Sequence, residues 1–306
     1  MVTTGAGPLR VGVVGAGPWA RLFHVPALVA HPDVELTAVW ARREEAAAEL
    51  AVPHGATAHA SFDRFLDEVD ALVFALPPDI QAELAGRAAQ AGKALLLEKP
   101  VALDLAAAER LSDVVQEAGV PTQMVLTWRY VPEVRALLAA MAGMSPLGGR
   151  GWFLTGGFLG GMFATPWRLQ HGPLLDLGPH VIDLLDAALG SVVGIRAHGD
   201  AHRWVGLLLE HEGGAGSEAA LTAYCALDPA RAGVEVYTPD GVLEVTTVGV
   251  SASASATLVD EFVATARSGQ PHALDVRHGL HLQRLLTVAA EDLDRGRHRH
   301  DEGHAG

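Results

Sequence analysis

Short apolar runs alternate with helical segments along the first 126 residues, and this alternation constrains the fold more than any other feature. The runs are rich in valine, leucine and alanine, and the segments between them place apolar residues on one helical face. Strands are expected within residues 9–17, 34–41, 70–77, 93–100 and 121–128, and helices within 18–30, 43–51, 79–92 and 103–119. Asp104 is the expected N-cap of the last helix. Strands this apolar predict a parallel sheet covered on both faces, in a doubly wound α/β domain ending near residue 126.

Beyond residue 126 the pattern changes to shorter turns and glycine-rich loops. After a helix at 132–141, apolar or alternating runs of strand length predict a large, mostly antiparallel sheet. One helix at 172–190 interrupts these runs, and helices at 256–269 and 276–296 follow them. A chain of 306 residues exceeds the usual size of a single core, so we expect two domains, 1–126 and 127–306. The second is predicted to be an α+β domain whose tail from about residue 296 is disordered.

Composition excludes several classes of protein. The formal charge of -14 and the lack of a basic stripe argue against nucleic acid as a partner. No apolar run approaches the roughly 20 residues needed to cross a bilayer, so no membrane partner is expected. Cys225 is the only cysteine, and the N-terminus has no signal-peptide pattern, so a cytoplasmic location without an intrachain disulfide is predicted. No metal site is expected.

A glycine turn follows the first expected strand. Its sequence, Gly15-Ala16-Gly17-Pro18-Trp19-Ala20, has the G-x-G-x-x-A form and opens a helix. Gly15 permits the tight turn, Gly17 lets the backbone approach a pyrophosphate, and Ala20 permits close packing of helix on strand. In this context the turn predicts dinucleotide binding by residues Gly15, Gly17, Pro18, Trp19 and Ala20, the alternative being a glycine turn without a ligand.

The end of the second expected strand bears on the choice between NADP and NAD. An acid at this point would accept hydrogen bonds from the adenosine ribose, whereas an arginine would accommodate a 2′-phosphate. The chain has Arg42 and Arg43 here, with Glu44 only afterwards, which favours NADP. NAD remains the alternative, because an arginine can also stack on adenine or simply begin a solvated helix.

The stretch "LLLEKPVAL" ends the fourth expected strand in a lysine. Leu95, Leu97 and Lys99 share one face of that strand, which places Lys99 at the carboxyl edge of the sheet, where ligands bind in such folds. Pro100 restricts the backbone of Lys99 to extended conformations. This position favours a functional lysine over the alternative of a solvated loop lysine.

These features, taken together, resemble the Gfo/Idh/MocA oxidoreductases over nearly the whole chain. The resemblance rests on the glycine turn, on Ala75 to Ala102, on "TWRYVPEVRAL" from Thr127, and on "GPLLDLGPHVIDLL" from Gly172. It implies that Lys99 contacts substrate and nicotinamide, and that Asp176 and His180 contact the reacting carbinol. Residues at the matching edge of the Rossmann domain, Leu76, Pro77 and Glu98, are further expected cofactor contacts.

Helical spacing supports this assignment, because Asp176, His180 and Asp183 lie four and then three residues apart and share one face. His180 is assigned to exchange the hydroxyl proton, as a histidine can near neutral pH. Lys99 supplies positive charge, and Asp176 grips a substrate hydroxyl or orients the lysine. Asp183 is assigned to supporting or packing the helix. The alternative reading of His180 and Asp176 is a core histidine and a helix-start acid.

The chain departs from the family's pattern in two places. Gln81 stands where many members have a histidine, and "QHGPLLD" replaces their glycine pair or triplet. The loop Gly156 to Gly172 is apolar and glycine-rich. Arg129, Trp167 and Arg168 are candidate substrate contacts, with ordinary packing or ion pairing as the alternative. His24 is expected to be structural.

We therefore expect an NAD(P)-dependent oxidoreductase that acts on a secondary alcohol or ketone of a sugar, cyclitol or related small molecule, in either direction. One alternative is a reductase or dehydrogenase of a less polar carbonyl, imine or dihydrodiol, which the apolar loop would suit. The other is a non-catalytic dinucleotide sensor, like the galactose-pathway repressor of yeasts. Apolar strands 203–211 and 220–227 favour a homodimer or homotetramer, as is common in the family.

Overall fold

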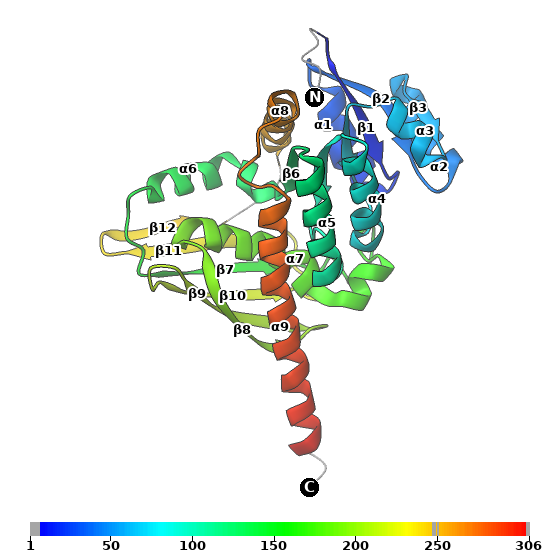
Figure 1. Ribbon diagram of the computed structural model, residues 1–306. Coiled ribbons are helices and arrows are strands. Elements are labelled where there is room, and N and C mark those ends of the chain that lie inside the picture. The colour runs from blue at the N-terminus through cyan, green and yellow to red at the C-terminus, as the bar shows by residue number, and fades with distance from the viewer. Residues whose placement is uncertain (1–6, 247–248, 250, 304–306) are drawn as a thin grey trace. The chain divides into compact units, whose positions relative to one another are not determined.

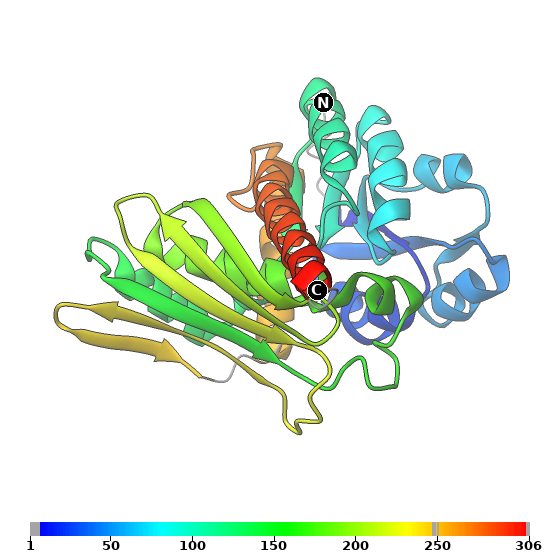
Figure 2. The same cartoon turned by 90° about the horizontal axis from the view of Figure 1, so that it is seen from below.

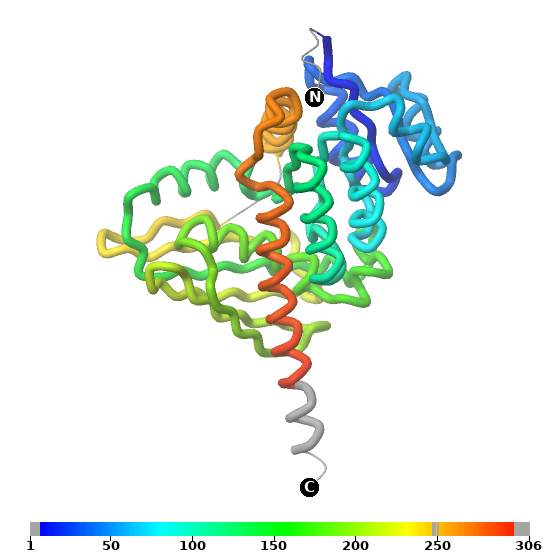
Figure 3. Tube along the Cα trace, in the orientation of Figure 1, coloured from blue at the N-terminus to red at the C-terminus, as the bar shows by residue number. Residues whose placement is uncertain are grey.

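The computed structural model describes residues 7–246, 249 and 251–303, with side chains described as far as residue 296 (Figure 3). The chain divides into two compact units. The first unit contains the chain up to Val125 together with Ser251–His281, and the second contains Leu126–Val250 and the chain from Leu282.

The first unit is built on a six-stranded sheet of order β3-β2-β1-β4-β5-β6, in which every neighbouring pair is parallel (Figure 1). Its strands are β1 (Leu9–Val14), β2 (Val34–Trp40), β3 (Thr57–His59), β4 (Ala71–Phe74), β5 (Ala94–Glu98) and β6 (Thr122–Val125). All residues of β4, β5 and β6 are buried, as expected for a sheet covered on both faces. The strand order reverses between β1 and β4, so the carboxyl ends of these strands flank the point at which doubly wound sheets bind ligands.

Helices connect these strands. They are α1 (Val25–Val29), α2 (Glu44–Ala51), α3 (Phe62–Asp67), α4 (Pro78–Gln90) and α5 (Leu105–Ala118). The N-cap of α5 is confirmed, since Oδ1 of Asp104 accepts from the amide of Ala107 at 2.8 Å. The doubly wound α/β fold predicted from the sequence is therefore confirmed.

The sequence pattern missed three local features of the first unit. The helix expected at 18–30 is a π-helix at Ala20–His24 followed by the short α1. Between α2 and β4 the chain also forms β3 and α3, which were not expected. β3 has only three residues and lacks a buried alternation, and α3 has six, so neither gives a clear periodic signal.

The C-terminal part of the chain contributes to both units. Residues 251–281, expected in the second domain, belong to the first unit and comprise α8 (Ala252–Ser268) and the start of α9 (Val276–Gly303). They bond to β6: Gln123 donates to the carbonyl of Leu258 at 3.1 Å, and the amide of Met124 donates to the carbonyl of Leu274 at 2.7 Å. Because β6 is the edge strand, this segment covers an edge that would otherwise expose unpaired backbone groups.

The expectation of a disordered tail from about residue 296 stays a prediction. α9 continues as a helix to Gly303, and the rest of the expected tail, 304–306, lies outside the described residues. A helix can continue here, because no proline follows Pro271 and an isolated glycine such as Gly296 is tolerated within a helix.

The second unit has a six-stranded sheet of order β12-β11-β7-β10-β9-β8. Its strands are β7 (Gly148–Leu154), β8 (Val192–Asp200), β9 (Trp204–His211), β10 (Gly216–Thr222), β11 (Arg231–Thr238) and β12 (Gly241–Val245). Only the β7–β10 pair is parallel among the described strands of this sheet, which confirms the expected, mostly antiparallel sheet. The strands form one layer in Figure 2.

Helix α7 (Pro166–Leu189) packs along this sheet, against β7, β9, β10 and β11. Helix α6 (Pro132–Met141) packs against β12 and α7, as expected for the helix at 132–141. Where α7 meets α9, a Cβ on Gly178 would lie 3.0 Å from Cδ2 of Leu286, so a glycine permits the close approach. The sheet's other face carries side chains such as Trp204 and Leu208, both exposed.

Within the described ranges, none of the helices has both the length and the apolarity that a membrane crossing requires.

Candidate functional site

The glycine turn after β1 has the backbone geometry that a dinucleotide requires. The amide of Gly15 donates to the carbonyl of Trp40 at 2.8 Å, and its φ of +117° lies in the region that favours glycine. A Cβ at this position would lie 2.5 Å from the carbonyl oxygen of Ala75, so no other residue fits. At Gly17, by contrast, a Cβ would meet no heavy atom within 4 Å. The backbone at Gly17 can therefore be approached closely by a pyrophosphate, and the turn fits a dinucleotide.

Other expected cofactor contacts lie along the same edge of the sheet. Ala20 is fully buried at the start of the π-helix, which allows the close packing expected there. Leu76 and Pro77 follow β4 and are half-buried, and Cδ2 of Leu76 would lie 3.1 Å from a Cβ on Gly15. The turn and the segment after β4 thus lie side by side at the carboxyl ends of β1 and β4.

Arg42 and Arg43 follow β2 and are exposed, with Arg43 at the N-cap of α2. Beside this strand end lies a polar cavity of about 530 Å³. Its lining residues come from the start of α2, the end of β3 and α3: Glu44, Ala58, His59, Ala60, Ser61, Arg64, Asp67 and Glu68. Two hydrogen bonds connect the lining of this cavity to the end of β2. The amide of Ala41 donates to the carbonyl of His59 at 3.3 Å, and Nε1 of Trp40 donates to the carbonyl of Ala60 at 3.0 Å. The sequence pattern gave no sign of this cavity, since β3 and α3 were not expected.

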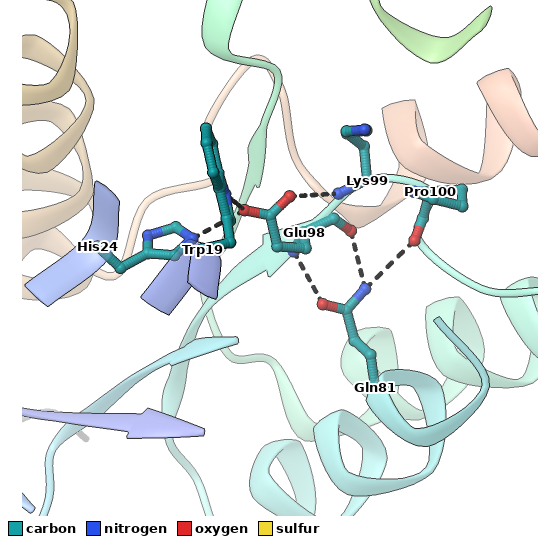
Figure 4. A network of polar contacts seen from close by, with 6 residues as sticks. All are labelled: Trp19, His24, Gln81, Glu98, Lys99 and Pro100. Carbon is teal, nitrogen blue, oxygen red and sulfur yellow. Dashed lines mark hydrogen bonds and ion pairs between the residues drawn. The ribbon is translucent and has the colours of Figure 1, made fainter. Parts of the chain in front are cut away.

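Glu98, the last residue of β5, is the centre of a buried polar network (Figure 4). Its Oε1 accepts from Nε1 of Trp19 at 2.6 Å and lies 2.8 Å from Nε2 of His24. Its Oε2 accepts from the amide of Lys99 at 3.3 Å. Both Glu98 and His24 are buried, at 8% and 2% exposure. The side chain of Glu98 therefore bonds to the glycine turn, and Lys99 is the next residue of the chain.

Gln81, the first-turn residue of α4 that stands in the family's histidine position, holds the main chain around Lys99. Its Nε2 donates to the carbonyl of Glu98 at 2.8 Å, of Val101 at 3.2 Å and of Pro100 at 3.4 Å. Its Oε1 accepts from the amide of Glu98 at 2.8 Å. Lys99 itself is half-buried, and the peptide bond between Lys99 and Pro100 is cis. The sequence had singled out Gln81 only as a departure from the family pattern, and His24 only as structural.

In the second unit, Asp176, His180 and Asp183 lie on α7 and are all buried, which agrees with the shared helical face predicted from their spacing. The imidazole of His180 stacks on the indole of Trp128, with ring centroids 5.4 Å apart and planes inclined by 22°. The ring of Phe153 lies 6.1 Å away at 62°. Sequence reasoning missed both aromatic partners, because they come from segments far from α7 in the chain.

Arg129 and Asp183 form an ion pair rather than standing separately. Nη1 of Arg129 donates to Oδ1 of Asp183 at 2.8 Å, and the Asp183 side chain is 1% exposed. This contact gives Asp183 the helix-supporting role expected for it. An ion pair was the alternative left open for Arg129, whose contact with substrate stays a prediction.

Asp176 is paired with Arg168 across a break in α7. Nε of Arg168 lies 3.1 Å from Oδ1 of Asp176. Between them, Gly172 has a φ of +73°, and a Cβ there would lie 2.0 Å from the carbonyl oxygen of Ala201, so the helix bends at a position open only to glycine. The guanidinium of Arg168 also stacks over the ring of Trp167, 4.7 Å from its centroid. The expected helix start at Gly172 is thus the bend, and α7 begins earlier, at Pro166.

The structure therefore brings the expected residues together in two groups. One, at the carboxyl edge of the first unit's sheet, joins the glycine turn to Glu98 and Lys99. The other, on α7 of the second unit, joins Arg168 to Asp176 and His180 to aromatic rings. Among the residues whose side chains are described, no three histidine, cysteine, aspartate or glutamate side chains gather as a metal site would require.

A doubly wound sheet with a glycine turn of this geometry defines the class: a dinucleotide-binding protein of the Rossmann type. Residues 9–126 match the sequence model of a family described as "Oxidoreductase family, NAD-binding Rossmann fold", GFO_IDH_MocA. Residues 9–126 therefore match the NAD-binding domain of the Gfo/Idh/MocA oxidoreductases, and the resemblance inferred from the sequence is confirmed over this part of the chain. The family binds NAD(P), the cofactor class expected from the sequence.

Curated relatives are similar over part of the chain. A dTDP-3,4-didehydro-2,6-dideoxy-alpha-D-glucose 3-reductase of Streptomyces violaceoruber is 32% identical over 200 residues, which are 61% of this chain and 56% of the relative. The enzyme of the same name from Actinomadura kijaniata is 32% identical over 219 residues, 68% of this chain and 61% of the relative. The chain thus matches somewhat over half of the length of these relatives.

Solved structures show the same fold over almost the whole chain. GenD2 from gentamicin A biosynthesis, in complex with NAD, has a TM-score of 0.85 at 22% identity and covers 95% of both chains. The WlbA dehydrogenase from Bordetella pertussis, in complex with NADH and UDP-GlcNAcA, has a TM-score of 0.83 at 22% identity, covering 94% of this chain and 97% of the other.

Proposed function

We propose that the protein is an NAD(P)-dependent oxidoreductase that interconverts a secondary alcohol and a ketone on a sugar or a related small molecule. The observation that supports it best is the arrangement at the edge of the first unit's sheet. There the glycine turn, shaped for a pyrophosphate, bonds through Trp19 to Glu98, and Glu98 precedes Lys99. A lysine fixed beside a dinucleotide turn is suited to act on the group that reacts with the cofactor.

Three residues of the chain are proposed to act on the substrate. Bound nicotinamide supplies or accepts the hydride. When the carbinol carbon loses its hydride, the hydroxyl proton must also leave, and we assign its removal, and its return in reduction, to His180. Lys99 stabilises the negative charge that develops on the carbinol oxygen. Asp176, held by Arg168, accepts a hydrogen bond from a substrate hydroxyl and fixes its orientation.

The loop before α7 favours a substrate with few hydroxyl groups. Leu159, Met162 and Phe163 are 58%, 48% and 39% exposed, and Phe163 lies 5.7 Å from the guanidinium of Arg168, the partner of Asp176. An apolar surface next to a substrate-gripping carboxylate suits a deoxygenated sugar better than a fully hydroxylated one. This agrees with the dideoxy-sugar names of the curated relatives, and we propose a deoxygenated keto-sugar, attached to a nucleotide, as the substrate class.

A turnover assay tests this proposal. The purified protein is assayed with NADPH and NADH against nucleotide-linked keto-deoxysugars, free sugars, cyclitols, and apolar ketones, imines and dihydrodiols. We expect fastest turnover with the first class, and loss of turnover by two or more orders of magnitude in Lys99→Ala and His180→Ala with cofactor binding retained. Lys93→Ala and His54→Ala are the matched controls. A protein that binds cofactor but turns over no substrate would instead support the dinucleotide-sensing alternative.

Oligomeric state and location complete the proposal. We propose that the exposed sheet face of the second unit, which carries Trp204 and Leu208 on β9, pairs with the same face of a second copy. Light scattering of the wild type and of Leu208→Glu checks this, with a dimer or tetramer expected for the wild type and a smaller species for the variant. The proposed cytoplasmic location rests on the single cysteine, and cell fractionation checks it.

A further inference from the structure

The network around Glu98 connects two parts of the first unit that are far apart in the sequence. Trp19 belongs to the glycine turn, and its indole donates to Oε1 of Glu98 at 2.6 Å, 79 residues further along the chain. The Trp19 ring is itself fixed, because it stacks on Phe23 with centroids 4.6 Å apart and planes inclined by 12°. The indole therefore joins the turn and the end of β5 through one directed bond (Figure 4).

His24 completes the surroundings of this carboxylate. Its Nε2 lies 2.8 Å from the same oxygen that accepts from Trp19, and its side chain is 2% exposed. A buried carboxylate is costly unless hydrogen-bonded, so Trp19 and His24 together fix where Oε1 of Glu98 stands. Once Oε1 is fixed, the carboxylate plane is fixed too, and Oε2 is held against the amide of Lys99.

The main chain around Lys99 is held from the other side by Gln81. Its carboxamide bonds to both the amide and the carbonyl of Glu98 and to the carbonyls of Pro100 and Val101. Besides these bonds, a chain of contacts from Trp19 through Glu98 to the amide of Lys99 connects the glycine turn to the backbone of Lys99.

We propose that Glu98 is a positioning residue through which the glycine turn sets the place of Lys99, so that a pyrophosphate seated on the turn fixes the lysine by way of Trp19. The catalytic consequence rests on the proposed function, in which Lys99 stabilises charge on the substrate. The link between the glycine turn and the position of Lys99 does not depend on the proposed function, because it involves only the first unit and a bound dinucleotide. A purely structural role would instead make the Trp19–Glu98 bond matter for stability alone.

The lysine content of the chain permits a direct measurement. Lys93 and Lys99 are the only lysines, so reductive methylation with ¹³C-formaldehyde labels two side chains and the N-terminal amine. Lys93 donates to the carbonyl of Val69 at 2.8 Å and serves as internal reference. Lys99→Arg identifies the Lys99 resonance by its absence. ADP-ribose is the probe, since it carries the pyrophosphate but not the nicotinamide.

We expect saturating ADP-ribose to shift and narrow the Lys99 resonance of the wild type and to leave Lys93 unchanged. In Trp19→Phe, which keeps an aromatic ring on Phe23 but has no N–H donor, the shift at saturation should fall at least twofold. Trp40→Phe is the matched control, because it removes an indole bond to the carbonyl of Ala60 in the same unit and should leave the shift unchanged. Equal Lys99 shifts in the wild type and Trp19→Phe would overturn the proposal.

A second variant keeps the proposal testable if Trp19→Phe does not fold or bind ADP-ribose. Glu98→Gln keeps a carbonyl for Trp19 but presents an amide group to the N–H of Lys99, so the Lys99 response should again fall at least twofold. An undiminished response in Glu98→Gln would also overturn the proposal. With an active enzyme, Glu98→Gln should lower kcat on the order of tenfold or more with the KM for NADPH within about twofold, since small displacements of a catalytic group are costly. A protein without turnover but with the expected Lys99 response would refute the proposed function and leave this inference standing.

Discussion

The carboxamide of Gln81 forms two hydrogen bonds with the main chain of Glu98, each 2.8 Å long: its Nε2 donates to the carbonyl of Glu98, and its Oε1 accepts from the amide of Glu98. Gln81 is fully buried, and its Nε2 also donates to the carbonyls of Pro100 and Val101, the two residues after Lys99. A side chain that is both donor and acceptor is needed for this pairing, which a glutamine provides. In this chain the glutamine that stands in place of the family's usual histidine therefore uses both the donor and the acceptor of its carboxamide in hydrogen bonds.

Gln81→Met should destabilise the first unit, because it leaves the amide and carbonyl of Glu98 buried without their partner. Each such group costs about 1–3 kcal/mol, so we expect a loss on the order of 3 kcal/mol in the free energy of unfolding. Urea denaturation measures it. Gln90→Met, an exposed position on the same helix, is the control and should change the free energy by less than about 0.5 kcal/mol. A loss for Gln81→Met no larger than that of the control would show that the pairing does not stabilise the fold.

Arg129→Met should destabilise the second unit strongly. It leaves the carboxylate of Asp183, whose side chain is 1% exposed, without its guanidinium partner, and breaking a buried pair in this way costs about 3–5 kcal/mol. Denaturation followed by circular dichroism measures the change. Arg87→Met breaks a pair with Asp63 whose side chains are 42% and 81% exposed, and should cost far less. Similar losses in the two variants would argue against a buried, stabilising pair at Arg129.

Arg168→Met should lower kcat/KM by roughly ten- to a hundredfold, because Asp176 loses the cation that orients it and a small displacement of a group that positions the substrate is costly. Arg168→Lys keeps the charge but not the planar stacking on Trp167, so it should lie between the wild type and Arg168→Met. Steady-state kinetics with the best substrate provides the measurement. Arg196→Met, at a 76% exposed side chain of the same unit, is the control. Unchanged kinetics in Arg168→Met would remove Asp176 from the proposed substrate contacts.

Replacing both Arg42 and Arg43 by alanine should weaken NADPH binding by tenfold or more and change NADH binding little, because each charge-assisted bond to a 2′-phosphate contributes about 1.5–3 kcal/mol. Titration of cofactor fluorescence measures both affinities. Arg110→Ala, an exposed arginine on α5, controls for the general change in charge. Equal losses for the two cofactors would argue against a phosphate contact and favour stacking on adenine.

Low pH should weaken the ion pair between Arg10 on β1 and Asp70, the residue before β4. The guanidinium of Arg10 donates to Asp70 at 2.7 and 3.0 Å and holds the pKa of that carboxyl below its usual value. A lowered folded-state pKa means that the stabilisation is present above the unfolded-state value, about 3.9, and is lost as the pH falls through the folded-state value. The side chains are 46% and 35% exposed, so the effect is small.

Comparison with Asp70→Asn checks this pH dependence. The wild type should be the more stable protein near pH 6, and the difference should shrink as the pH falls below about 4. Unfolding free energies measured across that range supply the comparison. A difference that stays constant with pH would contradict the lowered pKa of Asp70.

Local pattern was sufficient for the doubly wound sheet, the glycine turn, the position of Lys99 at the carboxyl edge and the shared helical face of Asp176, His180 and Asp183. These follow from periodicities of about 2 and 3.6 residues and from the conformational freedom of glycine, which are properties of short segments. The same reasoning missed β3 and α3, which are too short to be periodic.

Tertiary structure alone decided which side chains meet. The bonds of Glu98 to Trp19, His24 and Gln81 join residues 17 to 79 positions apart, and the pairs Arg129–Asp183 and Trp128–His180 join residues 52 to 54 positions apart. The return of residues 251–281 to the edge of the first sheet is of the same kind. A sequence states which groups a segment offers, but the partner of a buried polar group is chosen by the packing of distant elements, because only there is water excluded and the bond required.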